Sequence, residues 1–292
     1  MNDIVQLLIG GIAQGMIYSL IAFGYNITFS TSRMFNFSNG AFLMLGGVVG
    51  FILYMTFKIP FFAMLGGVIL VGICAGFIMY KTSIEPSLKS QSGIGWILAT
   101  LAFGIILKNL VEVTWGTDDK KFDSPFGAST LHFGSVGVYP QEILIISVSL
   151  LIVFGVEFFK RYTILGKAIV AVSEDKNTAS LMGINQRFVI LFSFLLASVI
   201  ACVAGVLVAP ITLVSATMGS VLGVKAYIVS IIGGLESGFG VLVGGLILGI
   251  SENMTARYIS TGYRDVPGFL ILILILLFLP KGIFGKKVIK KV

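Results

Sequence analysis

The chain has 292 residues, of which 57% are hydrophobic and only 11% are charged, and its mean hydropathy is +1.02. Soluble domains are roughly one-quarter charged, so this composition excludes an ordinary soluble protein and indicates an integral membrane protein. The net charge of +7 does not indicate a nucleic-acid partner, because Lys and Arg are scattered between apolar runs and cluster only after the last one.

The apolar runs predict transmembrane helices. Each run of about 20 residues can cross a hydrocarbon core of about 30 Å, which leaves room for about eight or nine helices and no sizeable soluble domain. Strands of a membrane barrel would alternate sides at every residue, and these runs do not. We therefore expect an all-α polytopic membrane protein with one transmembrane domain over residues 1–292. The predicted spans are 4–30, 36–57, 60–80, 93–113, 142–159, 188–209, a short one at 221–235, 239–256 and 267–280.

Basic residues gather between alternate spans. Arg33, Lys81 with Lys89, the loop 160–187 and the Lys-rich tail fall on one predicted side, and the acidic stretch 118–123 falls on the other. Cytoplasmic loops carry the excess of Lys and Arg, so we expect the N-terminus outside and the C-terminus in the cytoplasm. The short segment 221–235 either spans or re-enters the membrane.

Glycines recur four residues apart inside several spans, as at Gly11 and Gly15 or Gly245 and Gly249. This spacing places both glycines on one helix face, where they allow neighbouring backbones to approach closely. We interpret these pairs as sites of helix packing rather than as hinges.

Two polar breaks precede glycine-rich spans, FNFSNG at 35–40 and SATMGS at 215–220. Irregular backbone at membrane depth is tolerated only where it is buried in protein or faces water, so these breaks are candidates to border a pathway. The alternative is that both are surface loops. The residues predicted to line a translocation pathway are Asn36, Ser38, Asn39, Gly40, Thr217 and Lys225.

Few ionisable residues lie inside the predicted spans. Lys108 and Glu112 are four residues apart near the outer end of one span, where they can pair or extend toward the headgroups. Lys225, Glu236 and Glu252 are stronger candidates for a functional role. The alternatives are that Lys225 extends toward the headgroups in the same way and that Glu236 is solvated in a Gly-rich turn. Glu252, with Asn253, is expected to face a cavity. So few groups specify no proton relay.

Motifs for catalysis and nucleotide binding are missing from the sequence. The single histidine, His132, excludes an HExxH motif, and the Gly-Lys pairs are followed by Ala168 and Lys287 rather than by Ser or Thr. Cys74 and Cys202 lie in apolar runs and indicate neither a disulfide nor a metal site. We therefore expect no cofactor in this chain and, if transport uses ATP, an ATPase on another chain.

The loop 160–187 has the pattern of a helical hairpin. Ala168, Ile169 and Val172 form one apolar stripe, capping-type residues at 173–177 interrupt it, and a second apolar face ends at Gly183. The small side chains leave room for a partner's groove, whereas a helix lying on the membrane would carry larger anchors. The residues predicted to contact that partner are Gly166, Lys167, Ala168, Val172, Glu174, Asp175, Ala179, Met182 and Gly183.

Several blocks occur in a recognisable order along nearly the whole chain: 17–25, 36–41, 115–118, 166–184, and 223–226 running into 232–237. With them the chain resembles the membrane permease subunits of branched-chain amino-acid ABC importers, which are relatives of the ribose-type permeases. That family usually has an Asn-Phe-Ala/Ser-x-Gly motif where this chain has residues 36–40. Lys167 stands where the family commonly has Arg, which preserves the charge.

The resemblance implies an ABC importer permease fold with short or broken helices in a bacterial plasma (inner) membrane. It implies a second homologous permease as partner, two cytoplasmic ATPases that bind ATP and Mg, and an extracytoplasmic substrate-binding protein. It also implies that residues 166–183 enter a cleft on the ATPase and couple it to transport. The expected surroundings are a lipid bilayer and no nucleic acid.

The resemblance leaves the substrate open, because close relatives carry urea or short amides. The urea branch usually has a longer chain, which favours leucine, isoleucine or valine. A secondary transporter should show more buried acid, His or Arg pairs, and an intramembrane enzyme should show a nucleophile with a base. An ABC permease is therefore the favoured prediction.

Overall fold

The computed structural model describes residues 2–89, 94–127, 130–133 and 136–285. Within this part, eight helices are long and apolar enough to cross a membrane, and α10 (Met218–Gly233) is a shorter apolar helix. This confirms the predicted polytopic all-α class. The other long helices are α1 (Asn2–Ser32), α2 (Asn39–Phe51) with a π turn Ile52–Thr56, α3 (Phe61–Met79), α5 (Gly95–Trp115), α6 (Pro140–Tyr162), α9 (Gln186–Val208), α11 (Gly238–Tyr258) and α12 (Val266–Phe278), which follows a 3-10 turn Thr261–Tyr263.

Two details differ from the sequence prediction. The span 60–80 does not end before Lys81, because a π turn Tyr80–Ile84 continues α3 into α4 (Glu85–Lys89), where Glu85 pairs with Lys81 and Lys89 at helical spacing. The stretch around His132, which lies between the predicted spans 93–113 and 142–159, contains a short antiparallel hairpin, β1 (Leu131–Phe133) and β2 (Val136–Val138).

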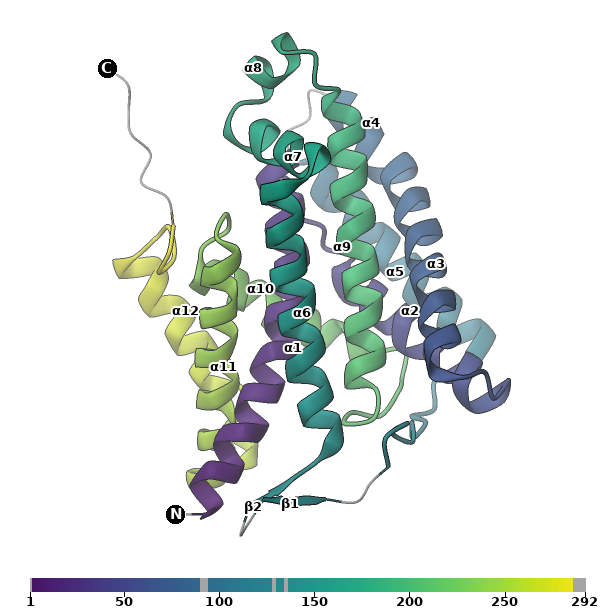
Figure 1. Ribbon diagram of the computed structural model, residues 1–292, viewed down its shortest axis with the longest axis vertical. Coiled ribbons are helices and arrows are strands. Elements are labelled where there is room, and N and C mark those ends of the chain that lie inside the picture. Colours follow the sequence, from purple (N-terminus) through teal and green to yellow (C-terminus); the bar gives the residue numbers. More distant parts are fainter. Residues whose placement is uncertain (1, 90–93, 128–129, 134–135, 286–292) are drawn as a thin grey trace.

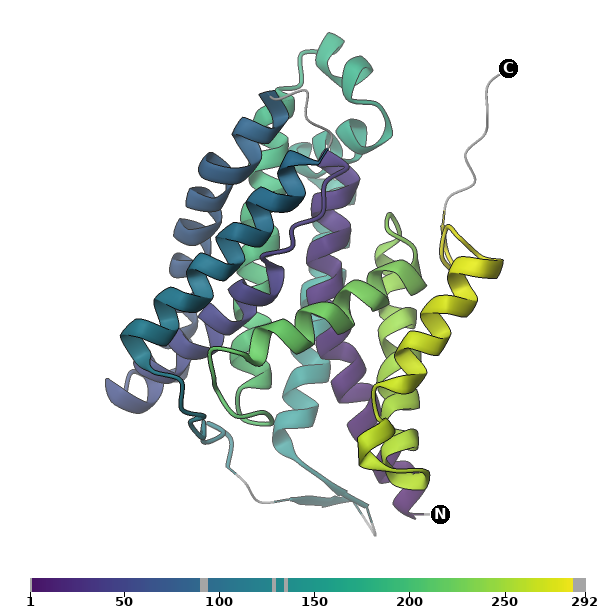
Figure 2. The ribbon, with the colours of Figure 1, turned by 180° about the vertical axis from the view of Figure 1, so that it is seen from behind.

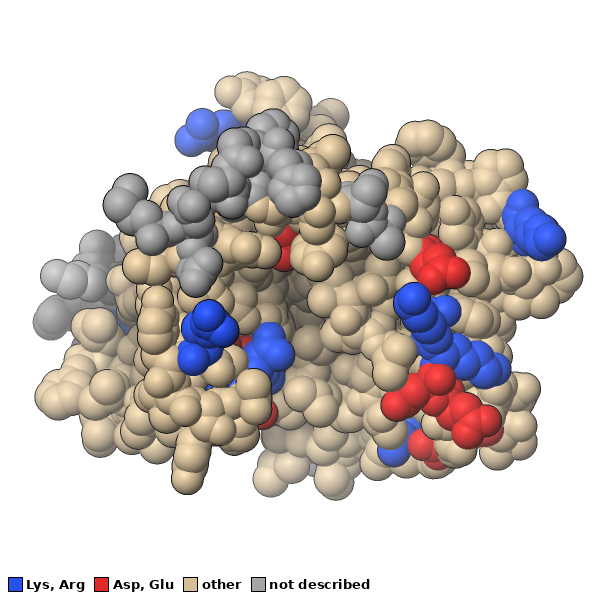
Figure 3. Space-filling view, turned by 90° about the horizontal axis from the view of Figure 1, so that it is seen from below, with Lys and Arg blue, Asp and Glu red and all other residues tan. Residues whose placement is uncertain are grey.

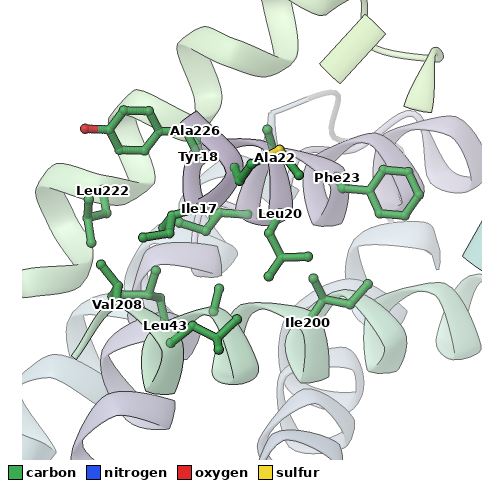
Figure 4. Packing of buried hydrophobic residues seen from close by; sticks show 14 of the residues in the cluster. Ile17, Tyr18, Leu20, Ala22, Phe23, Leu43, Ile200, Val208, Leu222 and Ala226 are labelled. Atoms are coloured by element: carbon green, nitrogen blue, oxygen red, sulfur yellow. The ribbon is translucent and has the colours of Figure 1, made fainter. Parts of the chain in front are cut away.

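The helices form one bundle with α1 at its centre (Figure 1). Along its middle, α1 is almost fully buried, and Leu20 points toward Ile200 of α9 and Leu43 of α2 (Figure 4). In contrast, α5 and α12 at the outside bury few of their residues, as expected for helices facing lipid or another membrane protein.

The glycine pairs bring α1 and α11 into backbone contact. A Cβ atom at Gly15 would overlap the carbonyl group of Gly245, and a Cβ atom at Gly249 would overlap the carbonyl group of Gly11. The predicted role of these pairs in close helix packing is therefore confirmed.

The two ends of the bundle differ. The N-terminus and the β hairpin lie at one end, and α7 (Ile164–Glu174) and α8 (Lys176–Leu181) project from the other (Figure 1). Seen from the N-terminal end, the surface carries acidic and basic side chains in mixed groups rather than a patch of one sign (Figure 3).

Candidate functional site

The first polar break is a re-entrant segment. Helix α1 ends at Ser32, and the chain reverses at Arg33, whose φ of 63° is left-handed. The side-chain amide of Asn39 then donates to the carbonyl of Ile21 at 3.2 Å. Because Ile21 lies about three helical turns before the end of α1, α2 begins roughly 16 Å below that end. The segment 33–38 therefore runs from the end of α1 back along its side into the bundle, so that α2 begins within the length of the membrane-spanning helices.

The side chains of this break are packed inward. Asn36, Ser38 and Asn39 are fully buried, and the Ser38 hydroxyl donates to the carbonyl of Thr100 on α5 at 2.5 Å. The Asn36 carboxamide oxygen accepts a hydrogen bond from the Ser38 amide at 3.1 Å, which supports the turn before α2. Asn36 Nδ2 and Asn39 Oδ1 make no hydrogen bond within the described chain. These side chains shape the break from inside rather than lining an open surface.

The second break meets the first. A Cβ atom at Gly40 would overlap the carbonyl of Gly219, and a Cβ atom at Gly219 would overlap the carbonyl of Gly40. One turn later, the Gly223 carbonyl accepts a hydrogen bond from the Tyr25 hydroxyl at 3.4 Å. Figure 2 shows α10 crossing the bundle at this level. Two segments far apart in the sequence thus form one crossing, a contact that the similarity of the two breaks does not predict.

A cleft of about 280 Å³ opens over this crossing, between α2, α5 and α10. Gly40, Gly219 and Gly223 contribute backbone to it, and Lys108 is the charged residue in its wall. Thr217 is exposed directly before α10 begins. The remaining residues of the cleft are mostly apolar or small: Tyr25, Phe37, Ala41, Met44, Leu101, Gly104, Ile105, Ala216, Ser220, Val224 and Tyr227.

Lys225 does not extend toward the headgroups, so that alternative is wrong. Its ammonium group lies 2.9 Å from Glu252 Oε2 on α11 and 2.7 Å from Asp265 Oδ1 before α12. Tyr18 of α1 also donates its hydroxyl hydrogen to Glu252 at 2.8 Å. Glu252 lines a cavity, as expected, and this cavity lies between α10, α11 and α12. Ser220 and Val224 line both this cavity and the cleft that contains Gly40, so the two adjoin on opposite sides of α10. Lys225 lines the cavity and not the cleft.

The hairpin of α7 and α8, named the coupling hairpin after its predicted role, forms from local capping signals. Before α7, the Thr163 hydroxyl oxygen accepts a hydrogen bond from the Gly166 amide at 3.0 Å. Before α8, the Asp175 carboxylate accepts hydrogen bonds from the amides of Asn177 and Thr178. These hydrogen bonds lower the pKa of Asp175 below its usual value. The bond from the Thr178 hydroxyl has the largest effect, and the two amide bonds add to it. Gly183, with φ of 85°, ends the hairpin.

The small apolar face of this hairpin is not open to a partner, which corrects the prediction for Val172 and Ala179. Both are buried together with Ile169 against Val189 of α9. Gly166 is also internal, because a Cβ atom there would overlap the carbonyl of Phe159. The residues that remain partly or fully exposed among those predicted to meet a partner are Lys167, Ala168, Glu174, Asp175, Met182 and Gly183.

The coupling hairpin is tied to the first break. Lys176 Nζ donates to the carbonyl of Ser32 at 2.7 Å, and Arg33 donates to the carbonyl of Ser173 at 3.3 Å and pairs with Glu236. The pKa of Lys176 is lowered mainly by burial of its ammonium group and, to a smaller extent, by repulsion from the positive charge of Arg33. Glu236 is thus ion-paired rather than merely solvated. The sequence gives no signal for these contacts, because Lys176 and Ser32 are 144 residues apart.

Comparison with known proteins agrees with this architecture. Residues 7–279 match the family model of the branched-chain amino acid transport system permease component. The chain is 32% identical to the high-affinity branched-chain amino acid transport system permease protein LivH of Salmonella typhimurium, over 99% of this chain and 97% of that protein. The corresponding protein BraD of Pseudomonas aeruginosa is 30% identical, over 99% and 98% of the two chains.

A solved structure shares the fold. PsaBC from Streptococcus pneumoniae, in complex with a Fab, superimposes with a TM-score of 0.52 over 93% of this chain and 91% of that chain, at 13% identity. With a match of the family model over almost its whole length, the chain belongs to the family of permease components of branched-chain amino acid transport systems.

Proposed function

We propose that this chain is a permease subunit of an ATP-driven importer of branched-chain amino acids, which forms the translocation pathway together with a second, homologous permease. The observation that carries the proposal is the full-length match to relatives named for this transport. The geometry supports it, since a hairpin outside the bundle is bonded to a re-entrant segment at membrane depth.

In this proposal the chain does no chemistry on ATP. Two cytoplasmic ATPases bind ATP and Mg and hold the exposed side of the coupling hairpin, including Lys167, Glu174 and Met182. The hairpin then lies in the cytoplasm, and the N-terminus, at the opposite end of the bundle, lies outside. A substrate-binding protein delivers the amino acid to that outer end.

We propose that a movement of the hairpin is passed to the re-entrant segment through the hydrogen bonds between them. A displacement of the coupling hairpin reaches Ser32 and Arg33 through Lys176 and Ser173. The next residues are the re-entrant segment, which leads directly to the crossing of Gly40 and Gly219. An ATPase that moves the hairpin would therefore shift the two breaks relative to each other.

Reconstitution into proteoliposomes tests this function. We expect the complex with its ATPases, second permease and binding protein to accumulate labelled leucine only with ATP inside the compartment that contains the ATPases. Unlabelled isoleucine and valine should compete, and urea or acetamide should not. Competition by urea or a short amide alone would favour an importer of those compounds. Accumulation driven by an ion gradient without the ATPases would contradict the proposal.

A further inference from the structure

The ion pair on α5 lies in an unusual position. Lys108 Nζ and Glu112 Oε1 are 3.3 Å apart, with 40% and 25% of their side-chain surface exposed. They are the only ionisable residues in α5, and Lys108 lies about two turns, or roughly 10 Å, before the helix ends. Charged side chains within a membrane-spanning segment are costly against lipid and face protein or water. This side of α5 is therefore expected to border a polar space.

That side of α5 faces the crossing of the two breaks. Thr100, Gly104 and Lys108 recur at intervals of four, each turned by about 40° around α5 from the one before, and Glu112 follows one helical turn further on. Thr100 accepts the hydrogen bond from Ser38, and a Cβ atom at Gly104 would lie 3.4 Å from the Ser38 Cα. Lys108 itself lines the cleft over Gly40 and Gly219. Lys108 is thus held beside the place where a moving break would open, and Glu112 is joined to it by the ion pair.

We propose that Lys108 and Glu112 form a binding site for the charged groups of a zwitterionic α-amino acid on its way through the permease. This inference rests on the proposed transport function. Lys108 would receive the carboxylate and Glu112 the ammonium group, while apolar residues of the cleft such as Met44, Ile105 and Val224 would contact the aliphatic side chain.

Charge balance favours this ligand class. A zwitterion that enters between Lys108 and Glu112 replaces one ion pair by two and leaves no charge unpaired. A simple carboxylate or amine would leave one of the two residues without a partner within a membrane-spanning helix, which is unfavourable. An uncharged amide would separate the pair without replacing it.

Transport by single and paired variants tests the site in the full complex. Lys108→Gln and Glu112→Gln should each reduce leucine transport at saturating binding protein about tenfold or more, the effect of one lost charge-assisted contact. The matched control is Lys81→Gln with Glu85→Gln, another pair at helical spacing on an exposed helix end, which should transport normally. Assembly of every variant is measured by co-purification.

The double variant Lys108→Gln/Glu112→Gln separates substrate contact from helix stability. It leaves no unpaired charge, so a merely structural pair would give normal assembly and normal transport. We expect normal assembly but transport at least as low as in the single variants. Normal transport by this double variant, or by both single variants, would overturn the inference. Because the wild-type complex transports leucine in the same assay, such a result differs from failure of the proposed function.

Thiol labelling gives a readout that does not depend on transport rate. The exposed Cys74 is first replaced by Ser, and Cys202 is buried. In the full complex, Lys108→Cys should react with a charged, membrane-impermeant thiol reagent during ATP turnover, and leucine should slow that reaction. Ile106→Cys, exposed on another side of α5, is the lipid-facing control and should stay unreactive. Equal reactivity at both positions, with no effect of leucine, would overturn the inference.

Discussion

The coupling hairpin and the crossing of the two breaks are built in different ways. In the hairpin, Thr163 and Asp175 cap helices that begin within three residues of them, and a small apolar cluster closes the turn. At the crossing, Gly40 and Gly219 have no role that their own neighbours in sequence explain, because each one makes room for the backbone of the other. The hairpin therefore depends on local hydrogen bonds, and the crossing depends on the whole bundle.

The largest expected effect lies beside the crossing, where Lys225 fixes α10 to its neighbours. Lys225→Met should destabilise the protein by about 3–5 kcal/mol, because it leaves the almost fully buried Glu252 without its closest cation. Thermal unfolding in detergent measures this loss. The double variant Lys225→Met/Glu252→Gln should recover much of the stability, and no recovery would show that the pair does not act as a unit.

The crossing itself should tolerate no side chain. Gly219→Ala places a methyl group against the carbonyl of Gly40 and should cost about 1–3 kcal/mol or more, since neither backbone can withdraw without moving its helix. Gly66→Ala is the matched control, because a Cβ atom there meets nothing within 4 Å. It should be neutral or slightly stabilising, as expected for Ala in a helix. Similar melting temperatures for both variants would contradict the close backbone contact between Gly40 and Gly219.

In the hairpin, the effect of a substitution on folding should depend on whether the replaced side chain is buried. Ala179→Arg forces a charged side chain into the cluster with Ile169 and Val172 and should open the hairpin, at a local cost of about 2 kcal/mol. Limited proteolysis between 163 and 183 measures this opening, and the bundle should remain folded. Met182→Arg, at a side chain that is 80% exposed, should leave proteolysis unchanged. Equal cleavage of the two variants would show that the buried face does not hold the hairpin.

The smallest effect on stability is expected for the link between the two regions. Lys176→Met removes the hydrogen bond to the Ser32 carbonyl and should cost about 1 kcal/mol, because the side chain is only partly buried. Its effect on function should be larger, with more ATP hydrolysed per leucine transported. Lys81→Met, at an exposed side chain outside the hairpin, is the control and should retain the wild-type ratio. If Lys176→Met hydrolyses the same amount of ATP per leucine as the wild type, the hydrogen bond from Lys176 to Ser32 does not couple ATP hydrolysis to transport.

Much of this protein follows from sequence patterns alone. Long apolar runs predicted the spans because backbone polar groups in a membrane must be satisfied within helices, and the glycine spacing predicted close packing because only Gly leaves room for it. Capping-type residues at 173–177 predicted the interruption between α7 and α8, since an Asp side chain satisfies nearby amides whatever lies further away.

Only the tertiary structure decided which distant residues meet. The partners of Lys225, the contact of Gly40 with Gly219, and the bond from Lys176 to Ser32 all join segments that no sequence period relates. The buried state of Val172 and Ala179 was misjudged for the same reason. A small apolar stripe fits a helix of the same chain as well as a partner's groove, and the choice depends on whether α9 lies within contact distance.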